Sequence, residues 1–277
     1  MSESTVKRIV SAIILIMIFA ICLWLGQDYT YVLLLVTAFL AIDEILINFV
    51  KLPSRTSGTY ITGQLIALFP LIAYYSVLKF SNVSLKEFLL HIGALINVFF
   101  VMYLFGFDLK KSKIIGPFIH NKIFTGLLLS LPMTSLIYIL FNENWLILLC
   151  FILVVNFSMD TGAWFFGKQF GRHKLWPEVS PNKTVEGLVG GALTSAFLGS
   201  IFYYMTLGTP DFILFLLMGL LGGMSQIGDL CQSKLKRQYG VKDSSNLIPG
   251  HGGVYDRIDS LIFLSPFFAL ALKYLNT

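Results

Sequence analysis

Charged residues are scarce in this chain. They make up 13% of its 277 residues, whereas hydrophobic residues make up 56%, and the mean hydropathy is +0.77. So few polar side chains cannot cover the surface of a soluble globule of this size. The composition therefore excludes an ordinary soluble protein and predicts an integral membrane protein.

Several kinds of site are also missing from the sequence. The three cysteines, Cys22, Cys150 and Cys231, do not have the spacing of a zinc site or of a disulfide framework. The chain has no His-Glu-x-x-His motif and no evident Ser-His-Asp arrangement, so hydrolysis is not indicated. We find no fixed-period repeat and no soluble accessory domain, and we expect no nucleic-acid partner.

The chain consists mainly of long apolar runs. A helix of about 20 residues crosses roughly 30 Å of hydrocarbon. Nine runs approach that length, near 9–26, 30–50, 60–79, 86–107, 123–141, 145–166, 187–207, 211–231 and 258–275. The predicted fold is an all-α polytopic membrane protein with about nine transmembrane helices. The first run lacks a small-x-small cleavage site before Gln27, so we interpret it as a retained span.

The positive charges separate between the two sides that nine spans define. Three of the 20 Lys and Arg residues, Lys79, Lys86 and Lys273, fall on one side. The other side holds Lys7, Arg8, Lys51, Arg55, Lys110, Lys111, Lys113, Lys122, Lys168, Arg172, Lys174, Lys183, Lys234, Lys236, Arg237, Lys242 and Arg257. By the positive-inside rule the richer side is cytoplasmic. We therefore expect a cytoplasmic N-terminus and an external C-terminus.

Chemically useful side chains are concentrated in the second half. Residues 1–142 form an N-terminal transmembrane region of about five spans with short connections. Residues 143–277 carry two dense polar segments, 156–187 and 226–260, both on the predicted cytoplasmic side. We therefore expect residues 143–277 to be a catalytic transmembrane region.

The segment 226–260 combines carboxylates suited to a divalent metal with cations suited to phosphates. Asp229 lies about a turn inside an apolar run, where an unpaired carboxylate is costly. If the helix continues, Ser233, Lys236 and Arg237 share its face. A basic helix end meeting anionic headgroups is the alternative, and it explains the cations but not Asp229. The remaining cations of the segment are Lys234, Lys242 and Arg257.

A glycine-rich turn at 249–253 precedes the last apolar run. It cannot continue a helix, and its glycines let backbone amides approach a ligand. Asp256 and Asp259 follow three residues apart on one helical face, where they repel unless a cation lies between them. Mg²⁺ is the usual ion at a site that also holds phosphates. The alternative is a structural pair, Arg257 with Asp259 or Lys242 with Asp256.

The segment 156–187 carries a second set of candidates. Asp160 lies about two turns inside the sixth run, so its burial requires a partner. Ser180 followed by Pro181 predicts a helix N-cap with proline at the first position. That arrangement would place Lys183 in the first turn, where free amides favour anions.

A separate carboxylate pair, Asp43 and Glu44, lies in the second apolar run. The pair could reach toward the site, neutralise a buried cation or be protonated. These three alternatives stay open at the level of the sequence.

The two polar segments together resemble the signature of the phosphatidate cytidylyltransferase (CDP-diacylglycerol synthase) family. The downstream signature, Ser-x-x-Lys-Arg-x4-Lys-Asp followed by Pro-x-His-Gly-Gly-x-x-Asp-Arg-x-Asp, is met by Ser233, Lys236, Arg237, Lys242, Asp243, Pro249, His251, Gly252, Gly253, Asp256, Arg257 and Asp259. The upstream pattern ends in Ser-Pro-x-Lys-Thr-x-Glu-Gly and is met from Asp160 to Gly187, with Trp164 where the family often has tyrosine. The resemblance covers about the last 120 residues; the first half resembles the family only in hydropathy and span count.

The resemblance implies an activity, in which CTP and phosphatidic acid give CDP-diacylglycerol and pyrophosphate. It implies Mg²⁺ as cofactor, with a second ion left open, and surrounding membrane lipids. It also implies a homodimer in the bacterial inner membrane, with the active site facing the cytoplasm.

We expect the following roles from the motifs. The expected metal ligands are Asp229 and Asp256, with Asp259 and Asp160 as weaker candidates that act through water. The expected catalytic residues are Asp229, Asp256, Lys236, Arg237 and Arg257. The expected substrate-binding residues are Ser233, Lys183, Lys242, His251, Gly252 and Gly253.

Two other functions compete with this one. A CTP-using membrane enzyme with a different acceptor, such as a polyprenol or phytol kinase or an ether-lipid cytidylyltransferase, would share much of the chemistry. A transporter of anionic solutes could use Asp43, Glu44 and Asp160 along its pathway. The complete downstream signature argues against the kinase, and the one-sided distribution of charge argues against the transporter.

Overall fold

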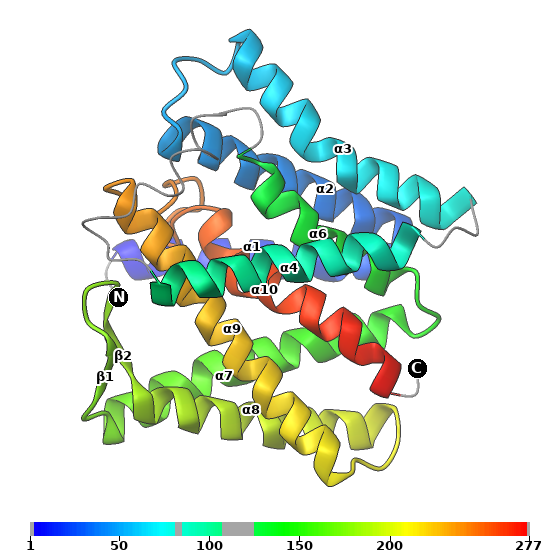
Figure 1. Ribbon diagram of the computed structural model, residues 1–277, viewed down its shortest axis with the longest axis vertical. Helices are drawn as coiled ribbons and strands as arrows, with labels where there is room; N and C mark the ends of the chain where they lie inside the picture. Colours follow the sequence, from blue (N-terminus) through cyan, green and yellow to red (C-terminus); the bar gives the residue numbers. More distant parts are fainter. Residues whose placement is uncertain (1–2, 81–84, 107–124, 276–277) are drawn as a thin grey trace.

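The computed structural model describes residues 3–80, 85–106 and 125–275, and these are mostly helical (Figure 1). The α-helices are α1 (Glu3–Leu25), α2 (Gln27–Glu44), α3 (Gly58–Phe80), α4 (Leu85–Gly106), α6 (Leu127–Leu140), α7 (Trp145–Phe170), α8 (Val185–Thr206), α9 (Phe212–Gln238) and α10 (Tyr255–Ala271). A π-helical segment, η1 (Ile45–Phe49), extends α2, and a 3₁₀ turn, η2 (Leu272–Tyr274), follows α10. The helical fold agrees with the predicted class.

Among the described residues, six helices are long and apolar enough to cross a membrane: α1, α2 with η1, α3, α7, α8 and α9. The fully described apolar parts of α4 (Glu87–Tyr103) and α6 (Leu127–Leu140) are shorter, and α10 has 17 residues. Every predicted run overlaps one described helix, so the membrane class is supported while the count of nine spans stays a prediction. Lys110, Lys111, Lys113 and Lys122 lie outside the described residues.

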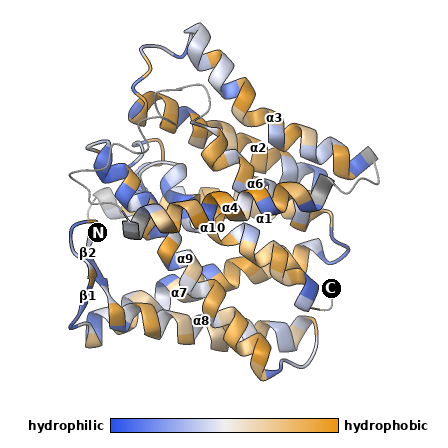
Figure 2. Ribbon diagram, in the orientation of Figure 1, coloured by the Kyte–Doolittle hydropathy of each residue, from blue (hydrophilic) through white to orange (hydrophobic). Residues whose placement is uncertain are grey.

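Hydrophobic side chains cover the outside of these helices as well as the core. Trp24, Phe69, Phe197 and Met205 are all exposed in this chain. Figure 2 shows hydrophobic residues along the lengths of the helices and hydrophilic residues gathered at the strands and nearby connections. An outward apolar surface of this kind suits lipid surroundings.

The helices place the polar connections at one end of the molecule. The N-terminus, the strands β1 (Lys174–Trp176) and β2 (Ser180–Thr184), and the connection from α9 to α10 lie at the left of Figure 1. The C-terminus and the turn from α8 to α9 lie at the opposite end. Helix α7 packs along α8, and α9 packs against both α8 and α10. Helix α9 therefore lies between the polar N-terminal ends of α8 and α10.

The sheet corrects one prediction. Strand β1 (Lys174–Trp176) pairs antiparallel with β2 (Ser180–Thr184), so Ser180 and Pro181 do not begin a helix. Helix α8 begins only after Thr184, whose hydroxyl accepts a hydrogen bond from the Gly187 amide at 3.1 Å and serves as the N-cap. Proline is tolerated here because a two-stranded sheet has only edge strands. Lys183 therefore lies in a strand, just before the helix.

Candidate active site

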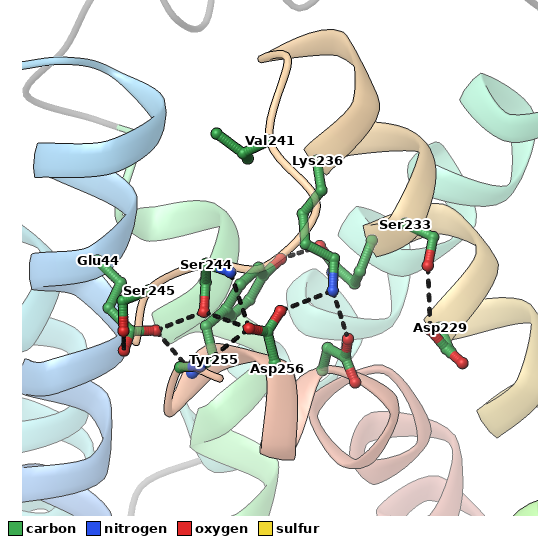
Figure 3. A network of polar contacts seen from close by, with 12 residues as sticks. Glu44, Asp229, Ser233, Lys236, Val241, Ser244, Ser245, Tyr255 and Asp256 are labelled. Atoms are coloured by element: carbon green, nitrogen blue, oxygen red, sulfur yellow. Dashed lines mark hydrogen bonds and ion pairs between the residues drawn. The ribbon is translucent and has the colours of Figure 1, made fainter. Parts of the chain in front are cut away.

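Helix α9 positions the first group of candidate residues. It runs without a break to Gln238, which confirms the continuing helix predicted beyond Asp229. The Ser233 hydroxyl donates to Asp229 Oδ1 at 3.2 Å, as a residue one turn away can (Figure 3). Arg237 is exposed, and its guanidinium donates to the Val241 carbonyl at 3.3 Å.

Strand β2 carries Lys183 to this helix. Its Nζ atom lies 2.5 Å from Asp229 Oδ2, so the partly exposed aspartate has the cationic partner that its position in an apolar helix requires. The two side chains line a pocket of about 240 Å³ together with Asp160, Asn182 and Gln226. The structure thus brings Asp160, Lys183 and Asp229 to one site from α7, β2 and α9.

A second cluster lies further along α9. Lys236 Nζ is 2.8 Å from Asp256 Oδ1 and 3.4 Å from Asp259 Oδ2. All three side chains are at least nine-tenths buried, with exposed fractions of 9%, 6% and 8%. The cation between the two aspartates is therefore the lysine of α9, and neither of the two structural pairs proposed from the sequence accounts for it.

The other oxygen of Asp256 is bound by the polypeptide backbone. Asp256 Oδ2 accepts hydrogen bonds from the Ser244 amide at 2.8 Å and from the Gly253 amide at 3.0 Å. Asp256 precedes the predicted span at 258–275. Burial raises the pKa of its carboxyl, but the Lys236 ammonium and the amide donors outweigh burial and hold the pKa below its usual value. Asp256 is therefore held as a carboxylate.

The glycine-rich turn folds back on itself. The Ile248 amide donates to the Gly252 carbonyl at 2.8 Å, and Gly252 has a φ of +85° that favours glycine. His251 Nδ1 lies 2.9 Å from the hydroxyl of Ser11 in α1. The phosphate contact predicted for His251 stays a prediction, and in the structure this nitrogen faces α1.

The other cations of the segment separate into two kinds. Lys242 and Arg257 are exposed and can reach a ligand from the aqueous side. Lys234 is 1% exposed, and its ammonium donates to the Tyr103 carbonyl at 3.1 Å and lies over the Tyr103 and Trp176 rings. Its burial among aromatic rings contradicts the interpretation of Lys234 as a phosphate ligand.

The sequence did not identify Ser244 as a residue near the site, and it left the role of Glu44 open. Asp43 pairs with exposed Arg55 at 2.8 Å and accepts from the Tyr60 hydroxyl at 2.7 Å. Glu44 instead accepts from the hydroxyls of Ser244 and Ser245. These serines lie in the spacer between the two parts of the downstream signature and match none of its named positions, so only their position in space identifies them.

The donor set can be compared with the requirements of Mg²⁺. Among the residues that the structure describes, no group of three His, Cys, Asp or Glu side chains is placed to hold a metal alone. Mg²⁺, however, is usually bound through one or two carboxylates, with waters and substrate phosphates completing its shell. Asp160 and Asp229 line one pocket and fit that pattern.

Known proteins are similar to this chain over part of its length. A phosphatidate cytidylyltransferase of Bacillus subtilis (strain 168) is 52% identical over 122 residues, which are 43% of this chain and 45% of the relative. A protein of the same name from Staphylococcus aureus (strain COL) is 43% identical over 127 residues, 46% and 48% of the two chains. Another from Staphylococcus haemolyticus (strain JCSC1435) is 42% identical over 120 residues, 43% and 46%. The chain therefore spans about half the length of the curated relatives it matches.

A family model covers much more of the sequence. The model of the cytidylyltransferase family matches residues 6–275. That range includes both polar segments and nearly all of the N-terminal region. Because the match extends over almost the whole chain, the chain belongs to the cytidylyltransferase family.

Proposed function

We propose that the protein is a phosphatidate cytidylyltransferase, which converts CTP and phosphatidic acid into CDP-diacylglycerol and pyrophosphate. The observation that carries this proposal is the shared pocket of Asp160, Lys183 and Asp229 in a chain of the cytidylyltransferase family. The relatives that bear this name support the choice of phosphatidic acid as the acceptor.

The reaction needs little acid–base chemistry. A phosphate oxygen of the lipid, already anionic at neutral pH, attacks the α-phosphorus of CTP and forms a new P–O bond. The bond from the α-phosphorus to its bridging oxygen breaks, and pyrophosphate leaves with the electron pair. The protein must therefore align two anionic substrates and neutralise their charge.

The residues of the pocket can both align the substrates and neutralise their charge. Asp160 and Asp229 would hold Mg²⁺, which when bound neutralises phosphate charge. Lys183 lies 2.5 Å from Asp229 and is placed to bind a phosphate. Ser233 orients the Asp229 carboxylate. Exposed Arg237, Lys242 and Arg257 would meet the phosphates at the aqueous surface.

The second cluster has a supporting role in this proposal. Asp256 and Asp259 fix Lys236, and their assignment as metal ligands remains a prediction. Lys236 lies two turns beyond Asp229 on α9. We assign Lys236 to a substrate phosphate that would bind between the two clusters.

An apolar groove next to the pocket suits the lipid. Its volume is about 500 Å³, and side chains of α8 and α9 line it, among them Leu188, Ala192 and Ile227. The polar pocket is lined by the adjacent residues Gly187 and Gln226, so the groove and the pocket adjoin. We place the acyl chains in this groove and the phosphate headgroup in the pocket.

The proposal includes an orientation and an assembly. Nine spans with a cytoplasmic N-terminus put both polar clusters on the cytoplasmic side, where CTP is available. The one-sided distribution of Lys and Arg supports this topology in the bacterial inner membrane. The external C-terminus and the homodimer follow from the same topology and family resemblance, and cross-linking of the purified protein tests the dimer.

Product analysis tests the proposed reaction. Purified protein in detergent is given Mg²⁺, phosphatidic acid and CTP labelled at the α-phosphate. We expect the label in lipid together with an equal amount of pyrophosphate. Release of CDP, with no α-label in lipid, would instead show a lipid kinase. Solute flux into proteoliposomes made with the same protein, without CTP turnover, would show a transporter.

A further inference from the structure

Glu44 is bound by a turn that lies far from it in the sequence. Its Oε1 atom accepts from the Ser245 hydroxyl at 2.6 Å and from the Val254 amide at 2.9 Å. Its Oε2 atom accepts from the Ser244 hydroxyl at 2.7 Å and from the Tyr255 amide at 2.9 Å. The residue is 2% exposed. Figure 3 shows this carboxylate of the N-terminal region meeting the connection between α9 and α10.

Asn48 holds the same turn. Its side-chain amide donates to the Ser244 carbonyl at 2.7 Å, so Glu44 and Asn48 bind the two sides of one serine. Asn48 lies in the π-helical segment η1, and short π-helical segments often occur at functional sites. The end of α2 is therefore fitted to the turn by two polar side chains.

The contacts continue from Ser244 into the second cluster. The Ser244 hydroxyl also lies 2.9 Å from Asp256 Oδ2, and the Ser244 amide donates to the same oxygen. The other oxygen of Asp256 binds Lys236. A continuous path of polar contacts therefore joins Glu44 through Ser244 and Asp256 to Lys236.

The path depends on very close packing at Gly253. A Cβ atom at this position would overlap the Ser244 hydroxyl and the Glu44 carboxylate. The Gly253 amide also donates to Asp256. The second glycine of the His-Gly-Gly motif is thus explained by its contact with Glu44 and Ser244.

We propose that Glu44 is a positioning residue for cytidylyl transfer. It holds the turn at 244–255 and, through Ser244, fixes the Asp256 carboxylate and the Lys236 ammonium. The inference rests on the proposed function and adds to it a residue outside both signature segments. A carboxylate suits the position because it can accept from all four donors, whereas glutamine would turn an NH₂ group toward two of them.

Activity measurements on Glu44→Gln test this role, with the adjacent Asp43→Asn as the matched control. Asp43 is also hydrogen bonded, but its partners are Arg55 and Tyr60. We expect E44Q to lower kcat for lipid labelling at least about 10-fold, E44D to recover part of the loss, and D43N to change kcat less than about 2-fold. Equal losses in E44Q and D43N would overturn the inference.

A double-mutant cycle separates positioning from general destabilisation. If Glu44 acts through Ser244, E44Q should lower kcat much less in a Ser244→Ala background than in the wild type. The same fold-loss in both backgrounds would show that Glu44 acts independently of Ser244 and would contradict the proposed path.

Hydrogen exchange provides a test that needs no enzymatic activity. We expect E44Q, but not D43N, to speed the exchange of the peptide that covers residues 244–256, whose amides bind Glu44 and Asp256. Unchanged exchange in E44Q would overturn the inference. If wild-type protein labels no lipid, the proposed function fails, and the exchange result still decides whether Glu44 holds the turn.

Discussion

The Nζ atom of Lys183 lies 2.5 Å from Oδ2 of Asp229, although the two residues are 46 positions apart in the chain. The contact joins the strand before α8 to the polar end of α9. It brings the two signature segments together at the pocket that Asp160 also lines. The arrangement has consequences that can be measured separately for stability, metal binding, lipid binding and catalysis.

Replacement of Lys236 by methionine should destabilise the protein strongly. The change leaves the buried carboxylates of Asp256 and Asp259 without their cation. Removal of one partner from a buried ion pair typically costs about 3–5 kcal/mol. Thermal unfolding in detergent checks this, with Lys79→Met as control because the Lys79–Asp28 pair is exposed. A K236M protein as stable as K79M would contradict the buried pair.

Thr184→Ala should weaken the start of α8. The Thr184 hydroxyl is the N-cap that accepts from the Gly187 amide, and loss of such a cap costs about 1 kcal/mol. Thr206→Ala is the control, because the Thr206 hydroxyl only bonds the Phe202 carbonyl within the same helix. A lower Tm for T184A than for T206A is expected. The opposite order would contradict the N-cap role of Thr184.

The metal requirement should change when Asp160 is replaced. Chelation of divalent ions should abolish lipid labelling, and added Mg²⁺ should restore it. Asp160→Asn removes one carboxylate from the pocket, so half-maximal labelling should need about 10-fold more Mg²⁺, within the range for lost metal-site interactions. The control Asp28→Asn, which changes an exposed pair, should leave the Mg²⁺ requirement unchanged. An unaltered requirement in D160N would remove Asp160 from the metal site.

The lipid groove can be tested by filling it. Ala192→Phe places a ring in the groove between α8 and α9, where it competes with an acyl chain for space. We expect the KM for long-chain phosphatidic acid to rise about 5-fold or more. This rise corresponds to a loss of about 1 kcal/mol of binding free energy, which is typical of a small change in an apolar pocket. The KM for CTP should stay the same. Leu198→Phe on the same helix is the control, and equal lipid KM values in both variants would place the acyl chains elsewhere.

The sequence predicts contacts well where they are local. Asp229, Ser233 and Lys236 follow helical spacing, so the continuing helix α9 places them near one another as expected. The position of Asp229 inside an apolar run also indicates correctly that it needs a polar partner, because burial of a lone carboxylate is costly, and Lys183 is that partner. Asp160, whose burial the sequence predicts, is instead exposed at the pocket. The helical class follows from the apolar runs for the same reason.

Contacts between distant segments could not be predicted in this way. Glu44 and Ser244 are 200 residues apart, and no periodicity relates them. The N-cap at Thr184 was misplaced at Ser180 because strand pairing with β1, a tertiary contact, competes with a good local capping sequence. The burial of Lys234 among aromatic side chains likewise depends on Tyr103, which lies 131 residues away.

The transfer of α-labelled cytidylyl from CTP to phosphatidic acid, compared between Asp229→Asn and Asp28→Asn, tests the central claim most directly. The isosteric change at Asp229 removes a pocket carboxylate and the partner of Lys183, and we expect transfer to fall at least about 100-fold, as for loss of a group that stabilises transition-state charge. D28N should match the wild type, and both variants should keep the wild-type Tm within a few degrees. Near-normal transfer by folded D229N would contradict the assignment of this pocket as the active site.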